Sequence, residues 1–289
     1  MPHSLSTEAK SPLEILFFGD LVGRPGRTAV KTYLKRLLEE TPVPKYPRII
    51  AANVENASHG FGLSLKQYQE LKEAGIQVFT SGNHIWDRKD IFSFIDQADA
   101  LVRPANFPAG SPGVGYRIFE VEGIQLAVIN LIGQVYMGTY NSPWDSLDNV
   151  MQNLKAITPN VFLDFHAEAT AEKNCMGYYA ASLGVSAMVG THTHVQTADE
   201  RIIEGQMGYI TDAGCNGVRD SVIGMDAENS LKRLKTQLPV RLDVAEGDPL
   251  QVNAVRFILD SETGRCHRVE RIHEVLSCLT VPEATLQTT

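Results

Sequence analysis

The segment Gly190–His194 carries two histidines, His192 and His194, that are separated by a single residue. Alternate residues of an extended segment face the same way, so both imidazoles can point into one site. A pair of this kind is ambiguous by itself, because surface or core histidines produce it about as often as a metal pair does. Other motifs in the sequence are therefore needed to predict whether these histidines bind a metal.

Four further polar clusters each follow a short apolar run that has the composition of a buried strand. The clusters are Asp20, Glu55-Asn56, Asn83-His84 and His166. A single aspartate after a strand is usually a helix cap or a turn residue, so each cluster alone is a weak signal. Five such clusters in one chain favour a shared site over coincidence.

The candidate ligands are a mixture of carboxylate, imidazole and amide oxygen. This mixture suits a borderline transition metal, whereas calcium prefers oxygen alone and a soft site uses thiolates. Counted without His84, the five clusters supply seven ligands, which are too many for one tetrahedral ion. Two ions that share one carboxylate would use all seven and leave positions for water and substrate. We therefore expect two divalent or trivalent transition-metal ions per chain, and the ligand mixture suits iron, manganese or zinc.

The elements that must position these clusters alternate along the chain. Strands are predicted at residues 15–18, 49–52 and 78–80, with helices at 25–38 and 64–74 between them. This rhythm indicates a mostly parallel sheet, whose ligand sites lie beyond the carboxyl ends of the strands. A hairpin over 116–131 and strands at 161–165 and 187–189 are also expected. From residue 239 onward, antiparallel strands at 240–244, 252–259 and 267–272 are predicted to form a second sheet.

Composition and charge narrow the class of protein. The chain has 289 residues, of which 43% are hydrophobic and 21% charged, as in ordinary folded proteins. The net charge of -8 disfavours binding of bulk nucleic acid. The longest basic feature is the Lys232, Arg233 and Lys235 group, which we interpret as a solvated helix face. We expect a single domain at 13–275, with a leader at 1–12 and a tail at 276–289.

The spacing of the cysteines and the hydropathy of the sequence help to predict where in the cell the protein is located. The four cysteines, Cys175, Cys215, Cys266 and Cys278, form no C-x-x-C pair, so free thiols in a reducing cytosol are expected. The sequence contains no apolar leader and no run of about 20 apolar residues, which predicts no membrane association. A cytoplasmic location follows as an expectation.

The motifs GD, NVEN, GNH, FH and GTHTH occur in the order typical of calcineurin-like metallophosphoesterases, and the chain resembles that superfamily. The stretches ENASHG, GNHIWDRKDI, LVRPANFP, DFHAEAT and GTHTHVQTAD look more narrowly like YmdB-type bacterial phosphodiesterases. This resemblance covers residues 15 to about 272. It implies an α/β fold: a four-layer α/β/β/α sandwich of the metallo-dependent phosphatase type, with two mixed sheets flanked by helices.

The resemblance also implies two ligand sets that share Glu55 as a bridge. The first metal would be held by Asp20, Glu55, Asn56 and His194, and the second by Glu55, Asn83, His166 and His192. His84 would donate a proton to the leaving alkoxide. The wider superfamily usually has a histidine where Val22 stands and an aspartate where Glu55 stands; the YmdB-type branch shares these departures, with the amide oxygen of Asn56 replacing the histidine.

The hypothesis from these roles is hydrolysis of a phosphodiester by a metal-activated hydroxide that attacks phosphorus in line. The preferred substrates are small phosphodiesters, in particular 2',3'-cyclic nucleotides. A nuclease or nucleotidase with the same metals is one alternative, and a non-catalytic, metal-dependent nucleotide sensor is another. A homo-oligomer is expected.

Several nearby residues have less certain assignments. Asp164, one strand period before His166, could orient a ligand imidazole or could be an ordinary strand-end carboxylate. His59, in the turn after the second cluster, could reach the site or could be an ordinary turn residue. Further candidates for the lining of the substrate cleft are Thr191, Thr193, Arg103 and Asn106.

Overall fold

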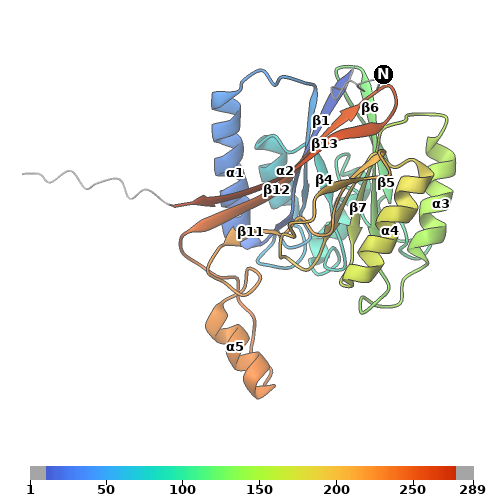
Figure 1. Ribbon diagram of the computed structural model, residues 1–289. Helices are drawn as coiled ribbons and strands as arrows, with labels where there is room; N and C mark the ends of the chain where they lie inside the picture. Colours follow the sequence, from blue (N-terminus) through green and yellow to red (C-terminus); the bar gives the residue numbers. More distant parts are fainter. Residues whose placement is uncertain (1–10, 278–289) are drawn as a thin grey trace, which may run out of the picture.

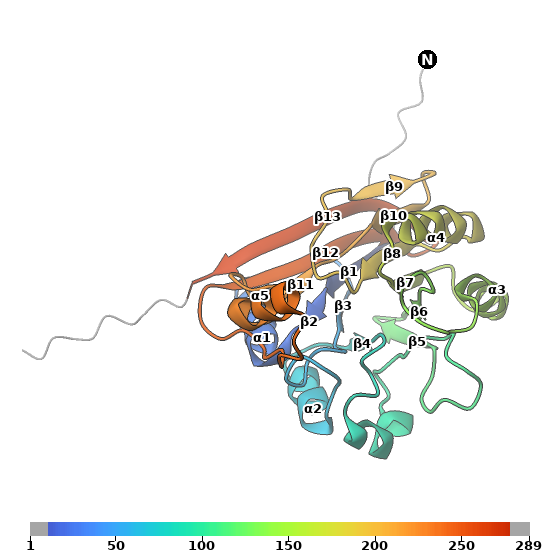
Figure 2. The ribbon, with the colours of Figure 1, turned by 90° about the horizontal axis from the view of Figure 1, so that it is seen from below.

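Two mixed β-sheets pack against each other, and helices cover their outer faces (Figures 1 and 2). The computed structural model describes residues 11–277. The first sheet has the strand order β2-β11-β12-β1-β3-β4, with β13 beside β12. Its strands are β1 (Pro12–Phe18), β2 (Asp20–Leu21), β3 (Arg48–Asn53), β4 (Val78–Thr80), β11 (Cys215–Val218), β12 (Leu250–Asp260) and β13 (Arg265–Leu276).

The second sheet has the order β5-β6-β7-β8-β10-β9. Its strands are β5 (Tyr116–Val121), β6 (Ile124–Ile132), β7 (Val161–His166), β8 (Ala187–Thr191), β9 (Arg201–Ile203) and β10 (Met207–Ile210). The helices are α1 (Gly23–Glu40), α2 (Leu65–Glu73), α3 (Pro143–Leu154), α4 (Thr170–Leu183) and α5 (Ala227–Thr236). Figure 2 shows α1 and α2 on the side of the first sheet, and α3 and α4 on the side of the second.

The continuous apolar run of β1 is explained by burial on both faces of its sheet. Ile15 and Phe17 point into the layer between the two sheets, where the ring of Phe17 lies 5.2 Å from that of Phe162 on β7. Leu16 and Phe18 point the other way, into the core under α1. Two buried faces leave the strand little freedom in register, and so its carboxyl end is held in place.

The predicted strand-helix alternation of the first half of the chain is confirmed. β1, β3 and β4 run parallel to one another, and so do β6, β7, β8 and β10. The carboxyl ends of parallel strands meet at one edge of a sheet. The two sheets therefore present the clusters that follow β1, β3, β4, β7 and β8 at a common edge.

The prediction that the C-terminal strands form a sheet of their own is wrong. β12 pairs antiparallel with β1, and β13 pairs with β12, so both belong to the first sheet. The reason is that β3 occupies only one edge of β1, and the free edge accepts β12. The predicted strand at 240–244 is absent as well, and Val244 makes only an isolated bridge to Met225.

The described strands reach slightly beyond the predicted domain limits. β1 begins at Pro12 and β13 ends at Leu276, whereas the rest of the predicted leader and tail lies outside the described residues. Cys175, Cys215 and Cys266 are free thiols as expected, and Cys278 is also outside the described part. No helix within residues 11–277 combines the length and the apolar character that a membrane crossing requires.

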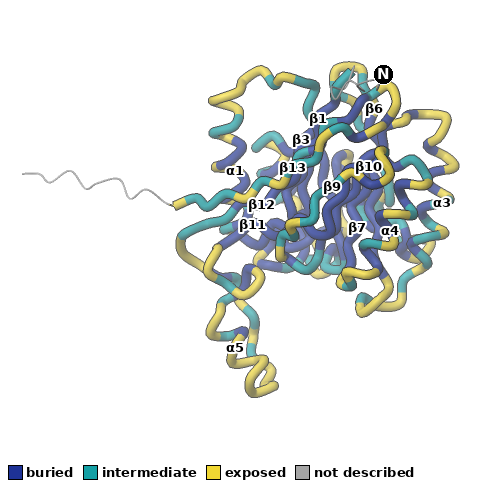
Figure 3. Tube along the Cα trace, in the orientation of Figure 1, coloured by how far each residue is buried: buried dark blue, intermediate teal, exposed yellow. Residues whose placement is uncertain are grey.

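α5 stands apart from the rest of the fold. It projects away from both sheets (Figure 1), and its surface is mostly exposed (Figure 3). Ser230 is its only buried residue. The helix begins at an aspartate cap, since the Asp226 side chain accepts a hydrogen bond from the backbone N–H of Asn229. The sequence-based interpretation of Lys232, Arg233 and Lys235 as a solvated helix face agrees with this exposure.

Candidate metal centre

The seven predicted metal ligands lie at strand ends on the shared edge of the two sheets. Asp20 follows β1 and starts β2, Glu55 and Asn56 follow β3, and Asn83 follows β4. On the second sheet, His166 is the last residue of β7, and the two histidines of the Gly190–His194 segment come directly after β8. Five segments that are far apart in the sequence thus supply one group of side chains.

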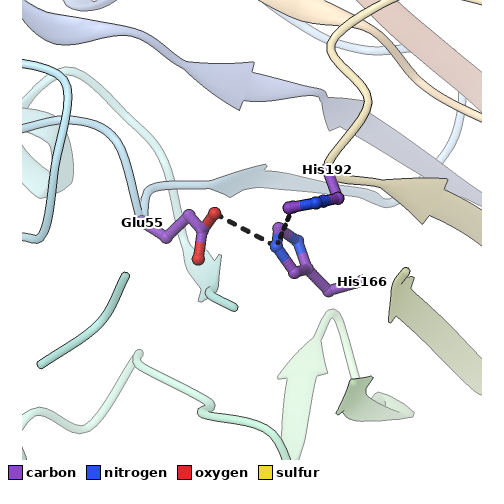
Figure 4. A group of neighbouring side chains, drawn as sticks. All are labelled: Glu55, His166 and His192. Atoms are coloured by element: carbon purple, nitrogen blue, oxygen red, sulfur yellow. Dashed lines mark hydrogen bonds and ion pairs between the residues drawn. The ribbon is translucent and has the colours of Figure 1, made fainter. Parts of the chain in front are cut away.

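Three of these ligands converge on one atom of a fourth, Nε2 of His166. Glu55 Oε1 lies 3.1 Å from it, Asn83 Oδ1 2.9 Å and His192 Nδ1 3.1 Å. Figure 4 shows the carboxylate of Glu55 and the ring of His192 directed at the His166 ring. The ligand atoms of Glu55, His166 and His192 all lie within 4.8 Å of one another. This group contains the full set that the resemblance assigns to the second metal.

The remaining ligands form a neighbouring group around Asp20. The Nε2 atom of His194 lies 3.7 Å from Asp20 Oδ1. Within the described part of the chain, Asp20 Oδ1 and Asn56 Oδ1 are buried and accept no hydrogen bond. The Asn56 amide donates its Nδ2–H to the carbonyl of Gly60 at 2.9 Å, which fixes the orientation of the amide. A buried acceptor without a donor costs about 1–3 kcal/mol, and a cation between these oxygens would remove that cost.

Gly82 of the GNH motif keeps space open between the ligands. A Cβ atom at this position would lie 2.3 Å from His166 Nε2 and 2.4 Å from Glu55 Oε2. Any larger residue would therefore occupy the volume between the donor atoms. Together with the orphaned oxygens and the mixed nitrogen and oxygen donors, this open space fits a transition-metal site.

Ionisation of the acidic ligands is set by burial and by the neighbouring histidines. Burial raises the pKa of Asp20 above its ordinary value. Burial also acts against ionisation of Glu55, but the charge and hydrogen bond of His166 outweigh it and lower the pKa of Glu55 to about 2. Glu55 is therefore a carboxylate at neutral pH, which is the form a bridging ligand requires.

The two histidines after β8 have opposite pKa shifts. Burial, followed by repulsion from His166, lowers the pKa of His192 to about 3. Burial would lower the pKa of His194 too, but the Asp20 carboxylate overrides it and raises that pKa to about 10. His192 is thus neutral and ready to bind a metal, whereas His194 holds a proton that a bound cation would displace.

Thr191 fixes the orientation of the His166 ring. Its hydroxyl donates to Asp164 Oδ1 at 2.8 Å, and its oxygen lies 2.9 Å from His166 Nδ1, so it accepts the Nδ1–H. Nδ1 is thus committed to Thr191, and Nε2 is the nitrogen that could bind a metal once it has lost its proton. Asp164 contacts the imidazole through Thr191 and not directly. Burial raises the pKa of Asp164 to about 7.

The two histidines of the Gly190–His194 segment reach the site by a route that differs from the predicted one. β8 ends at Thr191, and the backbone then has φ of 97° at His192 and 66° at His194. The expectation that an extended strand aligns the two rings is therefore wrong, because both residues adopt positive φ in a turn. Thr193 anchors this turn: Asp212 Oδ2 accepts from its N–H at 3.2 Å and from its hydroxyl at 2.7 Å.

His84 stands beside the ligands with a carboxylate partner of its own. Its Nδ1 lies 2.9 Å from Asp87 Oδ2, and its backbone N–H donates to Glu55 Oε2 at 2.8 Å. The ring of Phe61 packs edge-on against it, with the centroids 4.9 Å apart. His84 lines a cavity of about 300 Å³, which we call the metal cavity. Its walls include Glu55, Asn56, His192 and His194.

The chain matches a known sequence family. A family model described as "YmdB-like protein" matches residues 16–272, which is most of the chain. The chain belongs to this family.

Named relatives agree with this assignment. The chain is 46% identical over 261 residues to the 2',3'-cyclic-nucleotide 2'-phosphodiesterase of Bacillus subtilis, covering 90% of this chain and 96% of the relative. It is 35% identical to a protein of Mycoplasma pneumoniae that is named as a candidate phosphatase/phosphodiesterase, covering 91% and 93%. These relatives confirm the prediction of a YmdB-type phosphodiesterase.

A solved structure supports the fold. The crystal structure of a Mycoplasma pneumoniae protein, described as a novel phosphatase, superimposes with a TM-score of 0.84 at 32% identity. The alignment covers 92% of this chain and 94% of that one. The predicted α/β fold with two mixed sheets flanked by helices is confirmed.

Some secondary candidates of this YmdB-like chain do not line the metal cavity. His59 lies in a neighbouring cavity, where its Nδ1 is 3.0 Å from the guanidinium of Arg88. Arg103 donates to the carbonyls of Pro104, Ser111 and Pro112, so it holds a loop together. Asn106 likewise bonds to the backbone, at Ile132 and Asn141. Neither Arg103 nor Asn106 is among the wall residues of the metal cavity, and the contacts of both indicate a structural role.

Glu168 was missed by the sequence reasoning. Its Oε2 lies 3.1 Å from His192 Nε2, and it forms part of the metal-cavity wall. The only local signal is its place two residues after His166 in the DFHAEAT stretch, and a carboxylate there is also a common helix-start residue. Asp212, which anchors Thr193, gave no local signal at all.

Proposed function

We propose that this chain is a dinuclear metal-dependent phosphodiesterase that hydrolyses small phosphodiesters, with 2',3'-cyclic nucleotides as its preferred substrates. The observation that carries the proposal is the convergence of Glu55, Asn83 and His192 on Nε2 of His166, next to the orphaned oxygens of Asp20 and Asn56. The name of the Bacillus subtilis relative supports the choice of substrate.

Two sets of side chains would each bind one transition-metal ion. The first set is Asp20, Glu55, Asn56 and His194, and the second is Glu55, Asn83, His166 and His192. When bound, the ions would supply positive charge for the phosphoryl oxygens and would lower the pKa of a water molecule. Thr191 holds His166 in the tautomer that binds through Nε2, and the anchored Thr193 holds the turn that carries His192 and His194.

His84 is proposed as the proton donor to the leaving oxygen. Asp87 accepts a hydrogen bond from Nδ1, which orients the ring and leaves Nε2 to donate into the metal cavity. The backbone N–H of His84 is held by Glu55, so the donor keeps a constant position relative to the ligand set. General acid catalysis of this kind contributes about 10² to 10⁴ in rate.

The size and charge of the metal cavity support a small substrate. A volume of about 300 Å³ is at the lower end for small-molecule pockets. The net charge of -8 would repel a long polyanion. A nuclease is therefore the weaker alternative, and the His84–Asp87 pair argues against a pure sensor, since binding alone needs no proton donor. The cytoplasmic location and the homo-oligomer stay predictions.

The test combines metal content with turnover. The purified chain should hold about two transition-metal ions and should hydrolyse bis-p-nitrophenyl phosphate and 2',3'-cyclic AMP in the presence of manganese. Glu55→Ala and His192→Ala should abolish both activities and reduce the bound metal. His267→Ala is the matched control, because His267 lies on β13 in a different cavity.

Three outcomes separate the proposal from its alternatives. Bound metal without turnover of either compound would favour the sensor. Faster turnover of oligonucleotides or nucleoside monophosphates than of 2',3'-cyclic AMP would favour a nuclease or nucleotidase. A chain that binds no metal under any loading condition would contradict the dinuclear proposal.

A further inference from the structure

A second cavity adjoins the metal cavity and shares two wall residues with it, Phe61 and Leu242. Its volume is about 690 Å³. We call it the arginine cavity, because four arginines line it: Arg24, Arg88, Arg233 and Arg241. They come from α1, from the loop after β4, from α5 and from the segment after α5. The sequence shows no basic cluster of this kind, and only the fold assembles one.

Two of these arginines have acidic neighbours in weak, exposed pairs. Arg24 lies 3.9 Å from Glu246, with 77% of the Arg24 side chain exposed. Arg241 pairs at 3.0 Å with Asp243, two residues along the chain, and its side chain is 88% exposed. Exposed pairs of this kind contribute little free energy, so both guanidinium groups can turn to a stronger anionic partner.

The other two arginines have no carboxylate partner. Neither Arg88 nor Arg233 lies within 4.0 Å of an acidic oxygen in the described part of the chain. The Arg88 guanidinium donates to the carbonyls of Ser58 and Phe61 at 3.2 and 3.3 Å, so its position is fixed by backbone. Four arginines face only Asp243 and Glu246, which leaves a net charge of two positive when His59 is neutral.

This charge and geometry suit a phosphate monoester. A monoester carries a charge of about -1.5 to -2 at neutral pH, and arginine binds phosphate oxygens in a bidentate manner. The shared residues Phe61 and Leu242 provide an apolar wall between the two cavities, against which a sugar or base can pack. A nucleotide has the matching layout, since its 2',3'-cyclic phosphate and its 5'-phosphate lie on opposite sides of one ribose.

We propose that the arginine cavity binds the 5'-phosphate of a nucleotide whose 2',3'-cyclic phosphate lies in the metal cavity. This inference rests on the proposed function and specifies its substrate class: nucleoside 2',3'-cyclic phosphates that also carry a 5'-phosphate. Arg88 and Arg233 are the specificity-determining residues, because neither forms an ion pair within the described part of the chain, whereas Arg24 and Arg241 do.

The test compares adenosine 2',3'-cyclic phosphate with and without a 5'-phosphate, using the full, metal-loaded chain. The kcat/KM of the 5'-phosphorylated compound should be about tenfold higher, chiefly through KM, because charge-assisted hydrogen bonds to phosphate are strong. Arg233→Gln should reduce this ratio about threefold, the loss expected for one exposed charge contact. Lys235→Gln is the matched control, because it removes one positive charge from the same exposed helix without lining the cavity.

Binding of the two compounds to the metal-loaded chain, measured by calorimetry, gives a readout that does not depend on turnover. The 5'-phosphorylated compound should bind more tightly to the unmodified chain, and Arg233→Gln should reduce the ratio of the two affinities about threefold. Equal affinities, or a ratio that Arg233→Gln and Lys235→Gln change alike, would overturn the inference. Absence of turnover with a preserved difference in affinity would contradict the proposed function and leave the arginine cavity supported as a phosphate site.

Discussion

The metal cavity and the arginine cavity share a wall but are built in different ways. The ligands of the metal cavity come from the ends of strands or directly after them, and Asp20, Glu55 and His166 are almost completely buried. The arginine cavity is made by loops and by the projecting helix α5, and Arg24 and Arg241 are largely exposed.

This difference in construction indicates that the two cavities have different roles. Side chains on packed strands are held closely enough for chemistry, which tolerates displacements of only about 0.5 Å. Exposed arginines on loops can adjust to a ligand but contribute less free energy per contact. Substitutions in the metal cavity should therefore lower kcat or metal content, and substitutions in the arginine cavity should act on KM.

The largest effect is expected for His84→Ala. Turnover of 2',3'-cyclic AMP should fall by about 10² to 10⁴, because the alkoxide leaving group needs a proton. Turnover of bis-p-nitrophenyl phosphate should fall much less, since p-nitrophenolate leaves without protonation. Steady-state kinetics of both substrates provide the measurement, and equal losses on the two would contradict the proton-donor role.

Gly82→Ala should have the next largest effect. Its Cβ would lie 2.3 Å from His166 Nε2 and 2.4 Å from Glu55 Oε2, so the ligands would have to move apart. A displacement of about 1 Å can cost about 10² in rate, and bound metal measured by elemental analysis should fall as well. Gly217→Ala is the control, because the nearest atom to its new Cβ is Val22 Cβ at 3.7 Å. Unchanged metal content and kcat in Gly82→Ala would be evidence against this ligand arrangement.

Thr191→Val should have a smaller effect on the same cavity. The substitution removes the hydroxyl that bonds His166 Nδ1 and Asp164 while keeping the shape of the side chain. Metal affinity, measured by competition with a chelator, should fall about tenfold, the lower range for loss of such a supporting contact. Thr158→Val removes a buried hydroxyl that bonds the carbonyl of Gln125, far from the site, and should leave metal affinity unchanged. A similar loss in both variants would indicate a general effect on stability.

The smallest expected effect is the dependence of KM on ionic strength, which tests the exposed arginines of the arginine cavity. Raising salt from about 0.05 to 0.5 M should increase KM for the 5'-phosphorylated substrate a few-fold, because exposed charges are screened. The KM for the compound without a 5'-phosphate should change less, and kcat should stay constant for both. Equal salt dependence of the two KM values would remove the functional distinction between the cavities.

The positions of the ligand clusters could be predicted because they depend on local pattern. An apolar run followed by Asp20, Glu55 or His166 marks the end of a buried strand, and parallel strands bring such ends to one edge. The assignment of a metal centre then needed only the chemistry of the side chains. The resemblance to YmdB-type proteins supplied the pairing of ligands with each metal.

Other features of the site could not be predicted, since they depend on contacts between distant segments. The turn at His192 and His194 has positive φ, and Asp212, eighteen or more residues away, anchors it through Thr193. Glu168 is placed in the metal cavity by its contact with His192, which no local sequence pattern indicates. No periodicity in the sequence encodes either contact.

The amino-acid sequence by itself determined the family, because strand-end motifs are local properties, and the resemblance to that family then implied the fold class and the seven candidate ligands. Only the tertiary structure decided that β12 joins β1, that the oxygens of Asp20 and Asn56 lack hydrogen-bond donors, and that four separate segments bring their arginines to one cavity. The physical reason is that strand pairing, burial and electrostatic surroundings are set by packing between residues that are far apart along the chain.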